Sequence, residues 1–118
     1  MTEDEFRQVA LSFPATEEGV SYGRPAFKTR GKFLTRIRAE DESAVLLCVP
    51  HDEREFLMEA DPETFHITAH YKDYPSVLAR LSGLTAEQAR GFLERQWRKN
   101  VTKAMIREYE AARAAASG

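Results

Sequence analysis

A run of cationic side chains between residues 24 and 38 has the residue types that could bind an anion. The run contains six cations and no acidic residue. Its members are Arg24, Lys28, Arg30, Lys32, Arg36 and Arg38. Ammonium and guanidinium groups form strong, charge-assisted hydrogen bonds with phosphate and carboxylate oxygens. The sequence therefore predicts contact with an anionic partner along this run, and these six side chains are the candidate nucleic-acid-binding residues.

A second group of cations lies near the carboxyl end of the chain. Its members are Arg95, Arg98, Lys99 and Lys103. They could form a secondary basic patch that extends the first. The simpler interpretation is that the cations near the end of a helix complement its dipole and keep that surface solvated.

Histidine, cysteine and serine do not form a recognisable catalytic or metal-binding pattern. On the extended backbone expected here, His66 and His70 lie about 13 Å apart at about 3.3 Å per residue, too far to share a metal ion. Cys48 lies in the apolar run V-L-L-C-V and is expected in the core rather than as a nucleophile. We therefore expect no metal site and no cofactor.

Residue types of a hydrolytic triad are present at Ser21, His51 and Asp52. No strand–turn–helix elbow surrounds any serine, and no phosphate-binding glycine loop is present. Because nothing positions a base against a nucleophile, the sequence predicts a protein that is not an enzyme.

Length and charge are those of one small domain spanning residues 1–118. The net charge is -2, but it is segregated, with +6 over residues 24–38 and -8 over residues 39–64. No apolar run approaches the roughly 20 residues of a membrane helix, and the acidic start M-T-E-D-E-F is unlike a signal peptide. With a single cysteine and hence no disulfide framework, a cytoplasmic location is expected.

The cationic run reads as a β-hairpin, and its turn allows two registers. A two-residue loop at Arg30 and Gly31 would pair Lys28 with Phe33. A three-residue loop over 29–31 would pair Phe27 with Phe33 and set Lys28 opposite Lys32, with Gly31 in the left-handed region. We favour the three-residue loop, which faces Phe27, Phe33, Thr35 and Ile37 to the core and Lys28, Lys32, Leu34, Arg36 and Arg38 outward.

Capping signals and hydrophobic periodicity divide the rest of the chain into short elements. Capping signals begin at Thr2, Asp52 and Thr85, and a loop is expected over residues 15–23. Helices are predicted over 3–13, 52–60 and 86–99. A break follows at 100–102, and Thr102 caps a last helix. Further strands are predicted over 44–49, 65–68 and 76–81. The resulting fold class is α+β, with two layers: a five-stranded antiparallel sheet and helices on one face.

Aromatic residues fall into two groups. Trp97 lies on the apolar face of a predicted helix and is expected in the core. Tyr22, Tyr71 and Tyr74 lie in predicted loops beside polar residues. There they could stack on nucleic-acid bases or, equally, close an edge of the core.

Four segments resemble the MmcQ/YjbR family. They are S-Y-G-R-P-A-F-K-T-R-G-K-F at 21–33, A-D-P-E-T-F at 60–65, H-Y-K-D-Y-P-S-V-L-A-R-L at 70–81 and L-E-R-Q-W-R at 93–98. The resemblance implies an α-β(3)-α-β(2)-α fold like that of secretion chaperones, and DNA binding through a double-wing shape, with no catalytic residues. Many members carry a proline near position 100, and its absence here leaves one longer final helix as an alternative.

Two functions follow from these observations. The first is DNA binding, in which the hairpin cations contact the phosphate backbone with little sequence preference and strong salt dependence. The alternative is a protein-interaction module that docks an acidic partner or a second copy of itself through its segregated charge.

Overall fold

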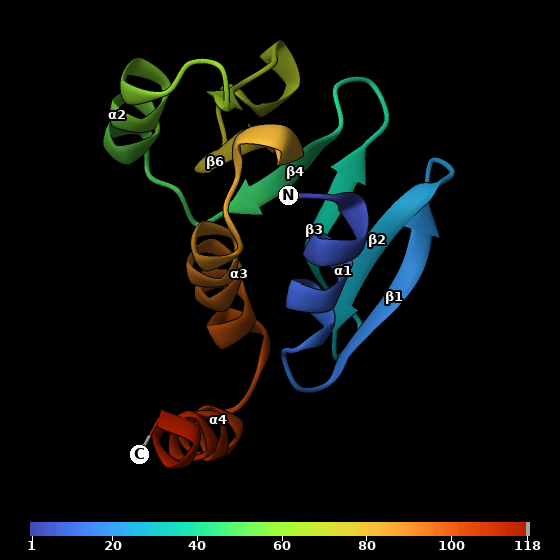
Figure 1. Cartoon of the computed structure of the whole chain (residues 1–118), viewed down its shortest axis with the longest axis vertical. Helices are drawn as coiled ribbons and strands as arrows, with labels where there is room; N and C mark the ends of the chain where they lie inside the picture. Colours follow the sequence, from blue (N-terminus) through green and yellow to red (C-terminus); the bar gives the residue numbers. More distant parts are fainter. Residues whose placement is uncertain (118) are drawn as a thin grey trace.

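The computed structural model describes residues 1–117 and has an α+β fold (Figure 1). The helices are α1 (Glu3–Leu11), α2 (His51–Ala60), α3 (Ala86–Asn100) and α4 (Lys103–Ser117). The strands are β1 (Thr16–Ser21), β2 (Arg24–Thr29), β3 (Lys32–Arg38), β4 (Ser43–Leu47), β5 (Phe65–His66) and β6 (Ser76–Arg80). Two 3-10 turns, η1 (Ala69–Tyr71) and η2 (Leu81–Gly83), complete the described elements.

The strands form one six-stranded antiparallel sheet in the order β1-β2-β3-β4-β6-β5. Helices α1 and α3 lie side by side over one face of it, α2 lies beside β5 and β6, and α4 extends past one end (Figure 1). The prediction of helices on one face therefore describes α1 and α3. None of the described helices has the length and apolar composition needed to cross a bilayer.

The core fills the space between the sheet and helices α1 and α3. Phe6 and Trp97 are fully buried and come from the two helices, while Phe27 and Ile37 are buried on the facing side of the sheet. The Trp97 indole Nε1 also donates to the carbonyl oxygen of Pro14 at 2.9 Å, which satisfies its polar atom. The prediction that Trp97 lies in the core is confirmed.

Two of the three predicted capping signals form, whereas Asp52 does not cap a helix, because α2 begins at His51 after Pro50 with no side-chain cap. Thr2 accepts from the Glu5 amide at 3.1 Å, and Thr85 accepts from the Gln88 amide at 3.1 Å, with the reciprocal side-chain bond present in each box. The predicted break after residue 99 is confirmed as well. Helix α3 ends at Asn100, and the Thr102 side chain accepts from the Met105 amide at 3.2 Å, so α4 starts as a separate helix.

The sheet has six strands, not five, because residues 15–23 are not a loop. Strand β1 occupies residues 16–21, and its side chains are exposed or half-buried. Helix α1 contacts this edge strand through a polar pair, with Arg7 bonded to Glu18 at 2.8 Å, and not through an apolar face. The strand therefore needs no alternation of apolar and polar residues, and the segment T-E-E-G-V-S shows none. Its pairing partner is β2, with Ser21 opposite Arg24 across a turn at Tyr22 and Gly23.

The predicted three-residue hairpin loop is wrong. Thr29 pairs with Lys32, so the loop contains only Arg30 and Gly31, whose φ angles of 53° and 79° are those of a type I′ turn. This turn twists in the same sense as the strands, which favours it over longer loops.

A β-bulge then restores the inward face of the hairpin. Lys28 pairs with Phe33 but Phe27 pairs with Thr35, which leaves Leu34 as the extra residue in β3. Leu34 is fully buried and Phe33 half-buried, the reverse of the prediction. Lys28 and Lys32 consequently do not oppose each other.

Candidate nucleic-acid interface

The turn of the β2–β3 hairpin presents three of the six predicted cations to solvent. Lys28, Arg30 and Lys32, here called the turn cations, are all exposed. None of them forms an ion pair with any residue from 1 to 117. The turn itself is anchored, because the Arg30 amide donates to the carbonyl oxygen of Ala15 at 3.0 Å. The backbone that carries these cations is therefore held in place, and the side chains are available to a ligand.

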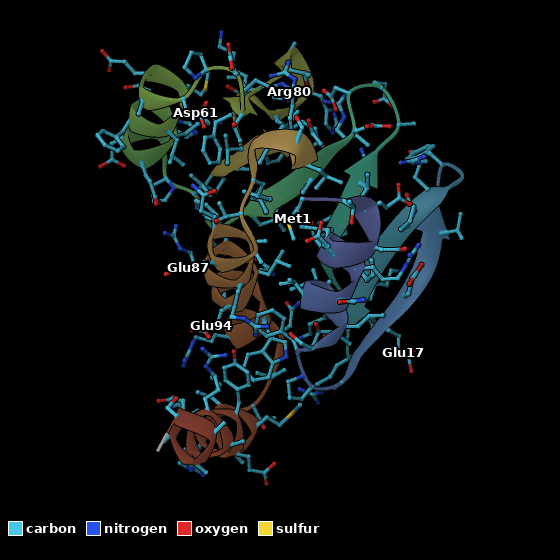
Figure 2. The ribbon with its side chains drawn as sticks, viewed as in Figure 1. Met1, Glu17, Asp61, Arg80, Glu87 and Glu94 are labelled. Atoms are coloured by element: carbon cyan, nitrogen blue, oxygen red, sulfur yellow. The ribbon has the colours of Figure 1, made fainter. Side chains whose placement is uncertain are left out.

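One acidic residue lies beside the turn cations without pairing to them. Glu17 is the cross-strand neighbour of Lys28 in the β1–β2 register. Figure 2 shows Glu17 near the lower end of β1, pointing away from the sheet. This carboxylate lowers the local positive potential but leaves the ammonium group of Lys28 exposed.

A buried asparagine brings the junction of α3 and α4 next to the turn. Asn100 is 3% exposed, and its side-chain nitrogen donates to the carbonyl oxygen of Phe33 at 3.0 Å. Lys99 precedes Asn100, Lys103 starts α4, and both are exposed and make no ion pair within residues 1–117. Asn100 was not among the residues predicted to contact the hairpin. Its only sequence signal is a polar residue at a predicted helix end between cations.

At the other end of the hairpin, where β2 begins and β3 ends, two arginines are bonded to acidic groups. We call this the open end. Arg24 pairs with Glu3 at 2.6 Å. Arg38 is 9% exposed and bonds Glu40 at 2.7 Å and Asp41 at 3.1 Å. Arg38 alternates with the core residue Ile37, as expected, but it is not available at the surface, because the turn after β3 folds its acids back over this side chain.

Arg36 occupies an intermediate position between two aromatic rings. Its Nη2 donates to the Tyr71 hydroxyl at 3.0 Å, and its guanidinium carbon lies 5.6 Å from the Tyr22 ring centroid. Tyr22 is 89% exposed and Tyr74 is 57% exposed, whereas Tyr71 is half-buried. Of the three loop tyrosines, Tyr22 and Tyr74 thus present ring surface to solvent, and Tyr71 orients a cation.

The secondary basic patch also contains two kinds of cation, those bonded to acidic groups and those that are unpaired. Arg95 forms a bidentate pair with Glu53 at 2.7 and 2.8 Å, and Arg98 bonds Glu94 at 3.2 Å and Glu110 at 3.1 Å. Hydrogen bonding to Arg95 lowers the pKa of Glu53. These two arginines join α3 to α2 and to α4, which leaves Lys99 and Lys103 as the available members of the patch.

Glu94 connects the two carboxyl-terminal helices a second time. It accepts from the Tyr109 hydroxyl at 2.9 Å and lies on the lower half of α3 (Figure 2). Burial, followed by this contact, raises the pKa of Tyr109. Helix α4 is thereby joined to α3 through Tyr109, as well as through Glu110.

A polar cluster at the open end contains serine, histidine and aspartate but lacks catalytic geometry. His66 Nε2 lies 2.9 Å from Ser43 Oγ and 3.5 Å from Asp41 Oδ2, so serine and acid face the same ring nitrogen. A triad needs the acid on the other nitrogen. Ser43 is also fully buried, out of reach of a substrate. Burial lowers the pKa of His66, with Arg80 and Arg38 acting in the same direction and Asp41 opposing them.

Cys48 lies outside the core, contrary to the sequence prediction. It follows β4 with a φ of 61°, is half-buried, and its thiol donates to Gln96 Oε1 at 3.1 Å. The left-handed backbone turns the thiol out of the strand's buried face. Within residues 1–117, no three His, Cys, Asp or Glu side chains converge as ligands for a metal ion.

Comparison with known proteins places the chain in a family. Neither the curated proteins nor the solved structures gave a significant match. A family model described as YjbR matches residues 11–99, from the end of α1 to the end of α3 and including the whole sheet. Because this match spans about three quarters of the 118 residues, the chain belongs to the YjbR family.

Proposed function

We propose that this protein binds DNA through the phosphate backbone, with the β2–β3 hairpin as the contacting wing. The proposal rests on one observation above the others: the bond from Asn100 to Phe33 gathers unpaired cations from distant parts of the sequence at one end of the molecule. The cations at this end are Lys28, Arg30, Lys32, Lys99 and Lys103. Family membership supports the same function, since the resemblance implies DNA binding.

The expected mode of binding is backbone contact without base readout. Lysine and arginine neutralise phosphates and release condensed counterions, and this term does not depend on base sequence. The side chains at the turn are flexible cations on exposed backbone, rather than the bidentate amide or guanidinium groups fixed in a groove that read base edges. We therefore expect similar affinity for duplexes of unrelated sequence.

Fluorescence anisotropy with a labelled 20-base-pair duplex at low salt tests the proposal. The test variant replaces Lys28→Gln, Arg30→Asn and Lys32→Gln together, since Asn suits the left-handed turn position and Gln keeps the strand side chains polar. We expect an affinity loss of about 100-fold, on the order of 1 kcal/mol per phosphate contact. Equal binding by the test variant and the wild type, or no wild-type binding, contradicts the proposal.

A charge-matched control separates local contact from overall charge. Lys72→Glu combined with Arg80→Ala lowers the net charge by the same three units at the opposite end of the molecule, where Arg80 is labelled in Figure 2. Long-range steering alone would weaken binding equally in both variants. We expect the control to retain affinity within about threefold at physiological salt, since the Debye length there is about 8 Å.

A second candidate, association with a protein partner or a second copy, is favoured by the exposed edge of the sheet. Strand β1 has a partner on one side only, and Val20 within it is 77% exposed. Unprotected edges are templates for strand addition. Light scattering at low and high salt tests it: a salt-independent dimer supports edge pairing, and a monomer at all concentrations counts against self-association.

A further inference from the structure

A hollow of about 340 Å³, lined by none of the turn cations, lies between the end of β4, the start of β6, residues 70–75 and the last turns of α3. Its volume is within the range of about 300–1,000 Å³ that small-molecule sites occupy. Its walls are mainly apolar and aromatic, with Tyr71, Tyr74 and His70 on one side. The His70 and Tyr71 rings meet edge to face, with their centroids 4.8 Å apart.

The aromatic wall is fixed by a buried arginine. Arg54 is 6% exposed, and its guanidinium donates to the backbone carbonyl oxygens of four residues at 2.8–3.2 Å. These residues are Tyr71, Lys72, Tyr74 and Ser76. Because the guanidinium spans the whole segment, Tyr71 and Tyr74 are held on a rigid backbone. A rigid aromatic wall suits a flat ring that packs offset or edge to face.

A serine hydroxyl at the hollow has no partner. Ser76 is fully buried and lines the hollow, and its Oγ makes no hydrogen bond to any of residues 1–117. A neighbouring polar group, Gln96, is already committed, since its Oε1 accepts from Cys48 and its Nε2 donates to Asn100 at 3.0 Å. Buried hydroxyls are normally hydrogen-bonded, so this one is a candidate partner for a ligand that displaces the side chains now covering it.

A cation completes the site. Lys99 lines the hollow from α3, is exposed, and forms no ion pair among residues 1–117. Its ammonium group suits a carboxylate or phosphate on a ligand whose ring lies against the tyrosines. An apolar wall, one buried hydroxyl and one cation at the mouth together define a ligand with a flat body and a charged end.

We infer that this hollow binds a planar aromatic ring that carries an anionic group, as a free small molecule or as an unpaired nucleotide in a strand. The ring packs on Tyr71 and Tyr74, a polar ring atom bonds Ser76 Oγ, and the anionic group pairs with Lys99. Lys99 is shared with the proposed duplex interface, but none of the turn cations lines this hollow, so the two sites can be tested separately through the turn cations.

Titration followed by two-dimensional ¹H–¹⁵N NMR tests the inference with thymidine 5′-monophosphate and indole-3-acetate as probes. We expect saturable shifts centred on Leu47, Cys48, Ser76 and Gln96 for at least one of them. Thymidine lacks the anionic group and should bind more weakly, by up to about fivefold, because it loses one ion pair at a partly exposed site. Absence of saturable shifts with both anions, or equal affinity for thymidine, overturns the inference.

Two variants and a control separate a ligand-binding role from a structural one. Ser76→Ala should leave the melting temperature of the free protein unchanged or raise it, because the lost hydroxyl had no partner, yet weaken probe binding by about three- to tenfold. Lys99→Gln should weaken binding by a similar factor. Lys103→Gln, at the start of α4 and outside the hollow, should not. A Ser76→Ala protein that melts earlier but binds the probe as before overturns the assignment of Ser76.

A short single strand, dT6, identifies the source of the ring. If dT6 competes with the mononucleotide and loses affinity in Ser76→Ala, the natural ligand is an unpaired nucleotide in a strand. If the mononucleotide binds and dT6 does not compete, the ligand is a free small molecule. Either result supports the inference. The variant lacking the turn cations should bind the mononucleotide normally, so failure of duplex binding and failure of this site are separable.

Discussion

At the open end of the β2–β3 hairpin, Arg38 is 9% exposed and bonded to two carboxylates, whereas at the turn end Arg30 is exposed and unpaired within residues 1–117. The two arginines belong to the same hairpin and to the same cationic run of the sequence. What differs is the neighbouring chain. The turn after β3 supplies Glu40 and Asp41, while the turn after β2 is two residues long and supplies no acid.

The contrast teaches that charge density along a sequence does not give charge availability on a surface. Six cations lie between residues 24 and 38, but Arg24 and Arg38 are used to hold the fold and Arg36 is held by tyrosines. The turn cations are the remainder. Nucleic-acid binding and fold stability should therefore respond to different members of one run, and the following variants test that separation.

The largest expected effect is on stability at the open end. Arg38→Ala should lower the free energy of unfolding by about 2 kcal/mol, because it removes a mostly buried cation and leaves Asp41 facing His66 without its counter-ion. The figure is below that for a fully buried pair because the Glu40 side chain is 64% exposed. Urea denaturation measures the change. Lys32→Gln is the matched control at the turn end and should stay within about 0.5 kcal/mol of wild type; equal losses would remove the distinction.

The next effect concerns the backbone of the turn. Gly31 has a φ of 79°, and a Cβ added to it would meet no atom within 4 Å, so Gly31→Ala introduces backbone strain without a steric clash. We expect a loss of about 1 kcal/mol in unfolding free energy. Gly19 also has open space but no positive φ, and Gly19→Ala should be neutral or slightly stabilising. Thermal denaturation of the two alanine variants side by side decides whether the left-handed turn is a real constraint.

Sequence patterns predicted the elements whose signals are local. The capping boxes at Thr2 and Thr85 and the helix start at Thr102 each depend on residues within one turn, and all three form. The apolar helix face that buries Trp97 was also predictable, because a hydrophobic period of 3.6 residues can be recognised without knowing which surface the helix packs against.

The features that the sequence concealed depend on long-range contacts. Strand β1 has no apolar alternation because its side chains are exposed or half-buried and its contact with α1 is polar. The bulge at Leu34 allows a two-residue turn and the burial of Phe27 in the same hairpin. The sequence did not distinguish Arg38 from the other cations of the run, because its burial depends on how Glu40 and Asp41 of the next turn fold onto it. In the candidate interface, the exposure of the turn cations could be predicted from their place in a hairpin. The approach of Lys99 to the hairpin could not, because it depends on the long-range bond from Asn100 to Phe33.

A smaller effect separates DNA contact from turn stability. Arg30 occupies a left-handed position with a φ of 53°, which Asn adopts more readily than Arg. Arg30→Asn should therefore keep or slightly raise the melting temperature while lowering duplex affinity about fivefold, near 1 kcal/mol. The slope of log K against log salt concentration should fall by about 0.9, the value for one phosphate contact. An unchanged slope would show that Arg30 meets no phosphate.

The smallest effect is the pH dependence of the open end. Burial lowers the pKa of His66 below its usual value near 6.5, so the unfolded chain binds more protons at this residue than the folded protein does. Stability should therefore rise with pH through the range just below 6.5 and be lost as the solution becomes more acidic. His66→Gln keeps a nitrogen donor near Ser43 and removes the titration, so its loss of unfolding free energy between pH 7 and pH 5 should be smaller than that of wild type. Arg30→Asn, at the turn end, should follow the wild-type profile. If His66→Gln and wild type lose stability in parallel as the pH falls, the pH response lies elsewhere. If only His66→Gln has a flatter profile of stability against pH, the open end, with its bonded charges, responds to protons and the turn end, with its unpaired charges, does not.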